Sequence, residues 1–173
     1  MNLPEVSGYI LWLLPDDLSS RFYRCEIERI ASMNNSVPFE PHITISRVPE
    51  ADPQELIKNL QALTKNISKF QIEFSEPVYG DLAYQKITLP VIPSTEFINT
   101  CNLIDSIFGS DISKRSFPHL SLFYGNHTKV MLRNELQALK KKTFPPVTIN
   151  YLALFKLEGP PSEWKMEFRF ELC

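Results

Sequence analysis

The chain carries one short phrase twice, Pro41-His42-Ile43-Thr44-Ile45 and Pro118-His119-Leu120-Ser121-Leu122. In each copy a histidine is followed two positions later by a hydroxyl residue, and apolar residues alternate with both. Residues i and i+2 of an extended strand point to the same face of a sheet. Each phrase therefore predicts a strand with an imidazole and a hydroxyl side by side above a buried apolar face.

The repetition points to one active site made from two halves. Two imidazoles that face each other across a cleft can serve as general base and general acid on one phosphate, while the two hydroxyls bind its oxygens. A single histidine in a strand is more often a half-buried residue whose ring nitrogens bond to neighbours. The pair favours the functional interpretation, because the chain has only three histidines and the third, His127, precedes the polar Thr128-Lys129 and predicts a solvated loop.

Length and composition are typical of one compact enzyme domain. The 173 residues suffice for a real core, and a net charge of -2 from 18 basic and 20 acidic residues lacks the positive field expected of a protein that grips long nucleic acid. The N-terminus has no basic segment, and the apolar run 9–14 is too short for a signal peptide or a membrane span. We therefore expect a cytoplasmic protein that acts on a small anionic substrate.

Strands and helices alternate along the chain, and a similar order of elements occurs in each half. Apolar periodicity and turn signals predict helices over 18–33, 53–66, 96–108 and 129–142, and strands over 8–14, 39–48, 70–78, 83–89, 117–124, 147–156 and 164–172. Asp52 is the expected N-cap of the second helix, and Ser94 or Thr95 that of the third. Because no low-complexity linker separates the halves, we expect a single domain, 1–173, with two lobes that each supply one histidine.

The two phrases resemble the HxT and HxS motifs of the two-histidine (2H) phosphoesterase superfamily. Within it the chain looks most like the eukaryotic cyclic phosphodiesterases, the 2′,3′-cyclic-nucleotide 3′-phosphodiesterases. The similar features extend nearly end to end and comprise 11–16, 39–44, 117–124, 152–154 and Trp164. The resemblance implies an α+β, bilobal 2H-phosphoesterase fold, in which two lobes related by a pseudo-twofold axis line a central cleft with antiparallel sheets and carry helices outside.

The same resemblance implies an activity and its residues. The activity is hydrolysis of 2′,3′-cyclic nucleotides to 2′-phosphates and of ADP-ribose 1″,2″-cyclic phosphate to the 1″-phosphate, within RNA metabolism such as tRNA splicing. His42 and His119 carry over as the catalytic pair, Thr44 and Ser121 as phosphate ligands, and Tyr124 as a substrate contact. We expect no cofactor, no membrane and no long nucleic acid as partner, and a monomer.

Several roles stay open at this point. Trp12 either stacks on a substrate base or belongs to the core. Tyr124 lies five residues after His119, so it reaches the histidine face only past a bulge or the end of the strand; otherwise it is a rim tyrosine. Gln85 or Lys86 could lie near the phosphate, which the spacing does not decide.

The sequence also bears on whether the reaction needs a metal and on which other functions the same residues could serve. The widely spaced Cys25, Cys101 and Cys173 contain no CxxC pair, and no carboxylate cluster surrounds either histidine phrase, so we expect metal-independent hydrolysis. Two alternatives use the same residues. One is an enzyme that processes RNA ends, like 2′-5′ RNA ligases or 3′-end trimming phosphodiesterases, and the other is a nucleotide-binding module without turnover.

Overall fold

The computed structural model describes residues 3–49, 52–108 and 118–173 and contains an antiparallel sheet that closes on itself. Its strands follow the order β1-β2-β6-β5-β3-β7-β8, β4 pairs with β5, and β1 also pairs with β7. The strands are β1 (Val6–Pro15), β2 (Ile43–Val48), β3 (Phe70–Phe74), β4 (Val78–Tyr79), β5 (Ile87–Ile92), β6 (His119–Phe123), β7 (Val147–Gly159) and β8 (Lys165–Glu171). Together with the helices described below, this antiparallel sheet confirms the expected α+β class.

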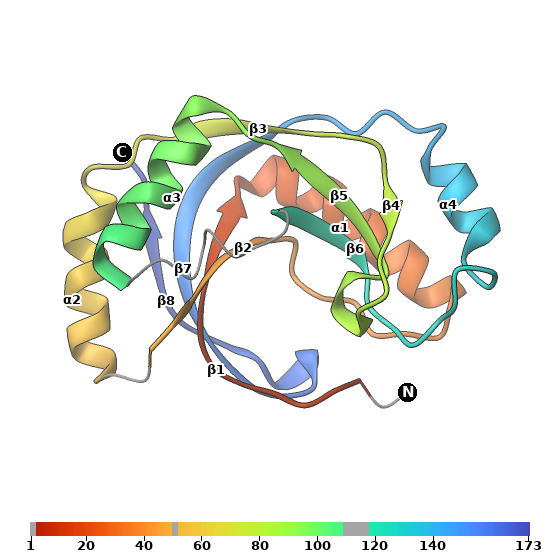
Figure 1. Cartoon of the computed structure of the whole chain (residues 1–173), viewed down its shortest axis with the longest axis horizontal. Helices are drawn as coiled ribbons and strands as arrows, with labels where there is room; N and C mark the ends of the chain where they lie inside the picture. Colours follow the sequence, from red (N-terminus) through yellow and green to blue (C-terminus); the bar gives the residue numbers. More distant parts are fainter. Residues whose placement is uncertain (1–2, 50–51, 109–117) are drawn as a thin grey trace.

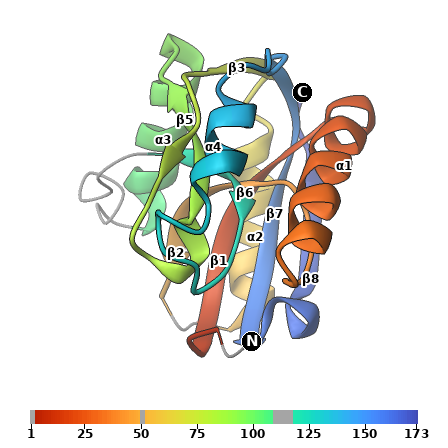
Figure 2. The same cartoon turned by 90° about the vertical axis from the view of Figure 1, so that its right-hand side faces the viewer.

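Four α-helices lie outside the strands of the described chain: α1 (Asp17–Met33), α2 (Pro53–Thr64), α3 (Thr95–Phe108) and α4 (Arg133–Leu139). Figure 1 shows α2 and α3 together at one end of the molecule and α4 at the other. Figure 2, turned by 90°, shows α1 running along the outside of the strands. No described helix combines the length and apolar character needed to cross a membrane.

The helix boundaries follow the expected capping chemistry. The Asp16 carboxylate accepts from the Ser19 backbone N–H at 2.8 Å, and Asp52 caps α2 in the same way, ahead of a proline in its first turn. The Ser94 hydroxyl accepts from the Phe97 N–H at the start of α3. Gly109, the C-terminal glycine expected for α3, lies outside the described residues.

Several predicted elements are shorter than expected: the strand expected over 39–48 begins at Ile43, and the one expected over 70–78 ends at Phe74. The helix expected over 129–142 spans only Arg133–Leu139, and Lys140 and Lys142 beyond its end form ion pairs with Glu76 and Glu26. The strand expected over 83–89 begins at Ile87, because residues 83–85 form the 3₁₀ turn η1 (Ala83–Gln85). A second 3₁₀ turn, η3 (Pro161–Glu163), separates β7 from β8.

The two faces of the sheet carry different residues. The main core joins alternate strand residues such as Leu11, Leu13, Ile43 and Leu120, all fully buried, to the inner faces of the helices. Truncating one of these leucines to Ala is expected to cost about 2–5 kcal/mol. A smaller cluster lies on the opposite face and comprises Ile10, Trp12, Leu14, Ala153, Phe155 and Leu157. We call that face of the strands the site face.

Candidate active site

The two motif strands are neighbours. Strand β2 pairs with β6 through Ile43 and Leu120, the residues between the histidine and the hydroxyl of each phrase. Both are fully buried in the main core, so the flanking His42, Thr44, His119 and Ser121 point to the site face by alternation. The structure thus brings the two predicted halves together on one face.

A bulge follows the hydroxyl residue in both motifs. Leu11 pairs with Ser46 whereas the next residue of β1, Trp12, pairs with Thr44, so Ile45 is the extra residue in β2. In the same way Ile87 pairs with Phe123 and Thr88 with Ser121, so that Leu122 is the extra residue in β6. A bulge shifts the alternation of a strand by one residue.

The β6 bulge explains the position of Tyr124. Because Leu122 is extra, Phe123 turns into the main core, and Tyr124, just beyond the strand, turns to the site face. Its hydroxyl lies 3.3 Å from His42 Nε2. Of the two placements that the sequence left open, the structure has the one beside the histidines.

Three contacts of its ring orient His42, through Nδ1, through one ring face and through Nε2. Its Nδ1 lies 2.6 Å from the Glu40 carbonyl oxygen, which can only accept, so Nδ1 carries the proton and Nε2 the lone pair. The imidazole stacks on Trp12 with centroids 3.6 Å apart and planes 13° apart. Burial, opposed by the Glu40 bond and assisted by nearby His119, lowers the pKa of His42 to about 3. His42 is therefore neutral, with Nε2 directed at Tyr124.

Tyr124 stays protonated and serves as the donor in that contact. Burial raises the pKa of Tyr124, and its ring stacks on Phe39 with centroids 3.6 Å apart. The Ser121 hydroxyl donates to the Tyr84 carbonyl oxygen at 3.0 Å. The phenol of Tyr124, the imidazole of His42 and the Ser121 hydroxyl thus have fixed positions before any substrate binds.

Aromatic side chains cover this group. Tyr84 of η1 contacts both Tyr124 and Trp164 edge-on or tilted, and its hydroxyl donates to the Pro4 carbonyl. His42, Ser121 and Tyr124 are each at most 5% exposed, so they are almost fully shielded from solvent.

Trp12 differs from a free stacking platform. It is 2% exposed and lies between His42, the residue just before β2, and Phe155 of β7, whose ring centroid is 4.0 Å away. This leaves little ring surface for a substrate base, which matches the core alternative and gives Trp12 a position from which it orients His42. The Lys86 ammonium donates to the Asp81 carbonyl and the Tyr79 hydroxyl, and the role left open for Gln85 or Lys86 near the phosphate stays open.

Phe39 and Tyr84 are the site residues that sequence reasoning missed. Both lie inside strands that the sequence predicts, over 39–48 and 83–89, but neither is in a strand of the structure, so strand alternation could not place them. No group of three or more His, Cys, Asp or Glu side chains in the described part of the chain could hold a metal ion.

Comparisons with known proteins agree with the fold. The family model described as "Cyclic phosphodiesterase-like protein" matches residues 7–171. The structure is similar to Escherichia coli LigT complexed with 3′-AMP, with a TM-score of 0.56, 13% identity and coverage of 96% of this chain and 98% of that one. It is similar to the same protein complexed with ATP, with a TM-score of 0.59, 13% identity and coverage of 98% and 99%.

A third similar structure is that of the protein TT0787 from Thermus thermophilus, with a TM-score of 0.58, 13% identity and coverage of 95% of this chain and 97% of that one. No curated protein matches the chain at the level of sequence.

Proposed function

Because the chain belongs to the cyclic phosphodiesterase-like family and is therefore a phosphoesterase, we propose that it hydrolyses cyclic phosphodiesters with His42 and His119 as an acid–base pair. The proposed substrates are 2′,3′-cyclic nucleotides, which yield 2′-phosphates, and ADP-ribose 1″,2″-cyclic phosphate, which yields the 1″-phosphate. The observation that supports this most is the shared face of the two motif strands, fixed by the Ile43–Leu120 pair.

The state of His42 supports its role as the base. A neutral imidazole with its lone pair on Nε2 can accept a proton from water, and the Glu40 carbonyl holds the same Nδ1–H before and after the transfer. The anionic phosphate of a bound substrate raises the pKa of His42 from its low resting value, because an opposite charge favours the imidazolium. The hydroxyl of Tyr124 occupies the position beside Nε2 until the water replaces it.

The proposed reaction balances with one water. The water oxygen forms a bond to phosphorus and gives its proton to His42 Nε2, while the bond from phosphorus to O3′ breaks and His119 protonates the leaving O3′. The hydroxyls of Thr44 and Ser121 bond to the non-bridging oxygens, where negative charge grows. We propose that no metal takes part, and that the enzyme acts as a monomer on small nucleotides.

The test uses adenosine 2′,3′-cyclic phosphate and identifies the product as the 2′- or 3′-phosphate. His42→Asn and His119→Asn are each expected to lower turnover by about two to four orders of magnitude. His127→Asn is the matched control, because it removes the third histidine, whose ring packs edge-on against Phe123, and is expected to leave the rate unchanged. A rate near wild type in either motif variant would overturn the acid–base pair.

Substrate length separates the alternatives. The same assay on a short oligonucleotide with a 2′,3′-cyclic end, and on one with a 2′-5′ linkage, measures RNA-end processing. Turnover of the oligonucleotides alone would replace the proposed substrates, and binding without turnover of any of them would make the protein a nucleotide-binding module.

A further inference from the structure

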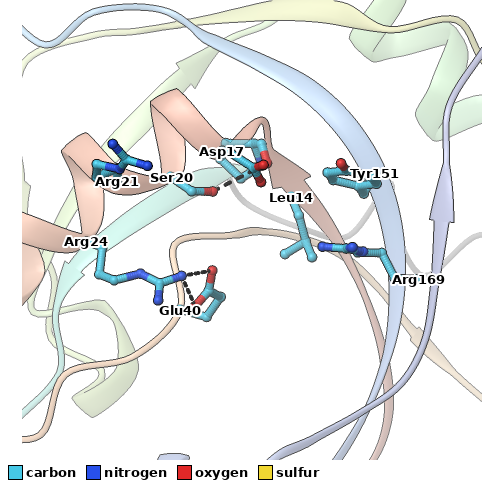
Figure 3. Close-up of a pocket in the computed structure, with 9 residues that line it drawn as sticks. Leu14, Asp17, Ser20, Arg21, Arg24, Glu40, Tyr151 and Arg169 are labelled. Atoms are coloured by element: carbon cyan, nitrogen blue, oxygen red, sulfur yellow. Dashed lines mark hydrogen bonds and ion pairs between the residues drawn. The ribbon is translucent and has the colours of Figure 1, made fainter.

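A pocket of about 300 Å³ opens beside the site face. Figure 3 shows Arg24 and Glu40 on one side of it and Arg169 on the other, with Leu14 between them. The α1 side also supplies Arg21, and Tyr151 of β7 completes the wall next to Arg169.

Strand pairing connects this pocket to the motif hydroxyl. Thr44 pairs with Trp12, Trp12 with Ala153, and Ala153 with Arg169, so the four residues form one row across β2, β1, β7 and β8. Directly paired residues share a face, which puts Arg169 on the site face with Thr44. At about 4.8 Å per strand the row places their Cα atoms roughly 14 Å apart.

The backbone makes a second connection. Glu40, whose carboxylate lies 2.6 Å from the Arg24 guanidinium, accepts from His42 Nδ1 through its carbonyl oxygen. Glu40, two residues before His42, therefore lines the pocket at its end nearest the motif histidine. The rest of the pocket extends along the site face away from His42.

The charge of the pocket is positive although that of the chain is negative. Its lining contains three arginines, at 21, 24 and 169, against the carboxylates of Asp17 and Glu40. Arg24 is paired with Glu40, whereas Arg21 and Arg169 have no ion-pair partner among the described residues. The chain as a whole carries -2.

Arg169 has a side chain suited to a phosphate. Its guanidinium lies over the Tyr151 ring, 4.4 Å from the centroid, and the residue is exposed at the pocket. A planar fork of N–H donors matches two oxygens of a phosphate better than a solvated ammonium does.

We propose that the Arg169 pocket binds a second phosphoryl group of the substrate, linked to the ribose that carries the cyclic phosphate. The inference rests on the proposed function, because it places the cyclic phosphate at the histidines. Its chemistry suits a 5′-phosphate monoester, a diphosphate bridge or the next phosphodiester of an RNA end. The enzyme would then prefer cyclic phosphates with this second anion over bare nucleoside cyclic phosphates.

Binding of two product-like nucleotides tests the pocket without turnover. Calorimetry compares adenosine 2′-phosphate with adenosine 2′,5′-bisphosphate, and the wild type is expected to bind the bisphosphate about 10- to 100-fold more tightly, as for hydrogen bonds to a charged group. Arg169→Gln and, separately, Arg21→Gln should remove most of this ratio, and Arg169→Lys should keep part of it. Arg133→Gln, on the exposed surface of α4, is the matched control and should keep all of it.

The outcomes separate the two proposals. Equal affinity for both nucleotides in the wild type, or a ratio unchanged in both glutamine variants, overturns the pocket even if cyclic phosphates are hydrolysed. If the wild type binds the bisphosphate more tightly by the expected ratio but hydrolyses no cyclic substrate, the proposed function is overturned and the anion pocket is supported.

Kinetics then identify the source of the anion. The three substrates are adenosine 2′,3′-cyclic phosphate with a 5′-phosphate, ADP-ribose 1″,2″-cyclic phosphate, and a dinucleotide with a 2′,3′-cyclic end. The one whose KM rises most in Arg169→Gln, with kcat retained, carries the anion that the pocket binds. A KM unchanged for all three would overturn the pocket as part of the substrate site.

Discussion

The imidazole of His42 lies flat against the indole of Trp12, with ring centroids 3.6 Å apart and planes 13° apart. The stack joins a residue of β1 to the motif histidine, and it is almost fully shielded from solvent. An aromatic face attracts a cation, so in the proposed mechanism the indole would stabilise the imidazolium that forms when His42 accepts a proton. We therefore propose that Trp12 acts through His42 and does not touch the substrate.

Replacing Trp12 by Leu is expected to lower kcat about tenfold with little change in KM, because a desolvated cation–π contact contributes about 1–2 kcal/mol. Trp12→Phe keeps an aromatic face and should retain most of the rate. Steady-state kinetics on adenosine 2′,3′-cyclic phosphate measure both. A raised KM at unchanged kcat in Trp12→Leu would mean that the indole stacks on the substrate instead.

The motif hydroxyls give a second prediction. Thr44→Ala and Ser121→Ala should each raise the activation free energy by about 2–4 kcal/mol if the hydroxyls act as preorganised donors to the phosphate. The Ser121 hydroxyl donates its one proton to the Tyr84 carbonyl, so it must turn to donate to a bound phosphate. A loss of rate in Ser121→Ala would show that it does. Kinetics together with thermal unfolding decide the matter, since a loss of stability with unchanged kinetics would make both residues packing groups only.

The substitution Tyr124→Phe removes the hydroxyl and keeps the ring, so it measures what the hydroxyl contributes. The ring keeps its stack on Phe39, whereas the contacts of the hydroxyl with His42 Nε2 and with the Ser121 side chain are lost. One hydrogen bond contributes about 1 kcal/mol, so the free energy of unfolding should fall by about that amount, while turnover should change less than about fivefold because water replaces the phenol beside Nε2 in the proposed mechanism. A loss as large as that of His42→Asn would show that the phenol itself transfers a proton.

The motif pair was predictable because its signal is local. Alternation along a strand places His42 with Thr44 and His119 with Ser121, and it also limits Tyr124 to two positions. The choice between these depends on the bulge at Leu122, which arises from pairing with β5 and leaves no mark in the motif. The sequence shows that Tyr124 reaches the histidine face only if the strand has a bulge or ends before it. The sequence does not show whether the bulge forms.

The residues around the motif depend on tertiary contacts. Tyr84 was expected on a strand, yet η1 turns it toward Tyr124 and Trp164. The Arg169 row depends on the pairing of β1 with β7, two strands that lie far apart in the sequence. Local patterns specify elements and faces, whereas the register between distant strands selects which side chains meet.

Removal of divalent metal should leave the activity unchanged. In the proposed mechanism His42 and His119 move the protons and the Thr44 and Ser121 hydroxyls bind the growing charge, roles that a two-metal site assigns to its ions. Dialysis against EDTA followed by assay on a 2′,3′-cyclic nucleotide measures this. Activity that the chelator abolishes and that magnesium, manganese or zinc restores would contradict the roles given to both histidines.

The low pKa of His42 predicts how stability depends on pH. Burial lowers the pKa from 6.5 to about 3, so between these values the unfolded chain binds a proton that the folded one does not. The free energy of unfolding should therefore be greatest above pH 6.5 and fall as the pH drops toward 3. For one such group the loss between pH 7 and pH 5 is about 2 kcal/mol.

Urea unfolding of the wild type and of His42→Asn at pH 7 and pH 5 isolates this contribution, because the two proteins share every other titrating group. The wild type should lose about 2 kcal/mol more than the variant on acidification. The carboxylates of Asp16 and Glu26, whose pKa values the fold lowers, lose their contribution only at lower pH and in both proteins alike. If both proteins respond equally to pH, then His42 titrates normally in the folded state and is not held neutral as a resting base.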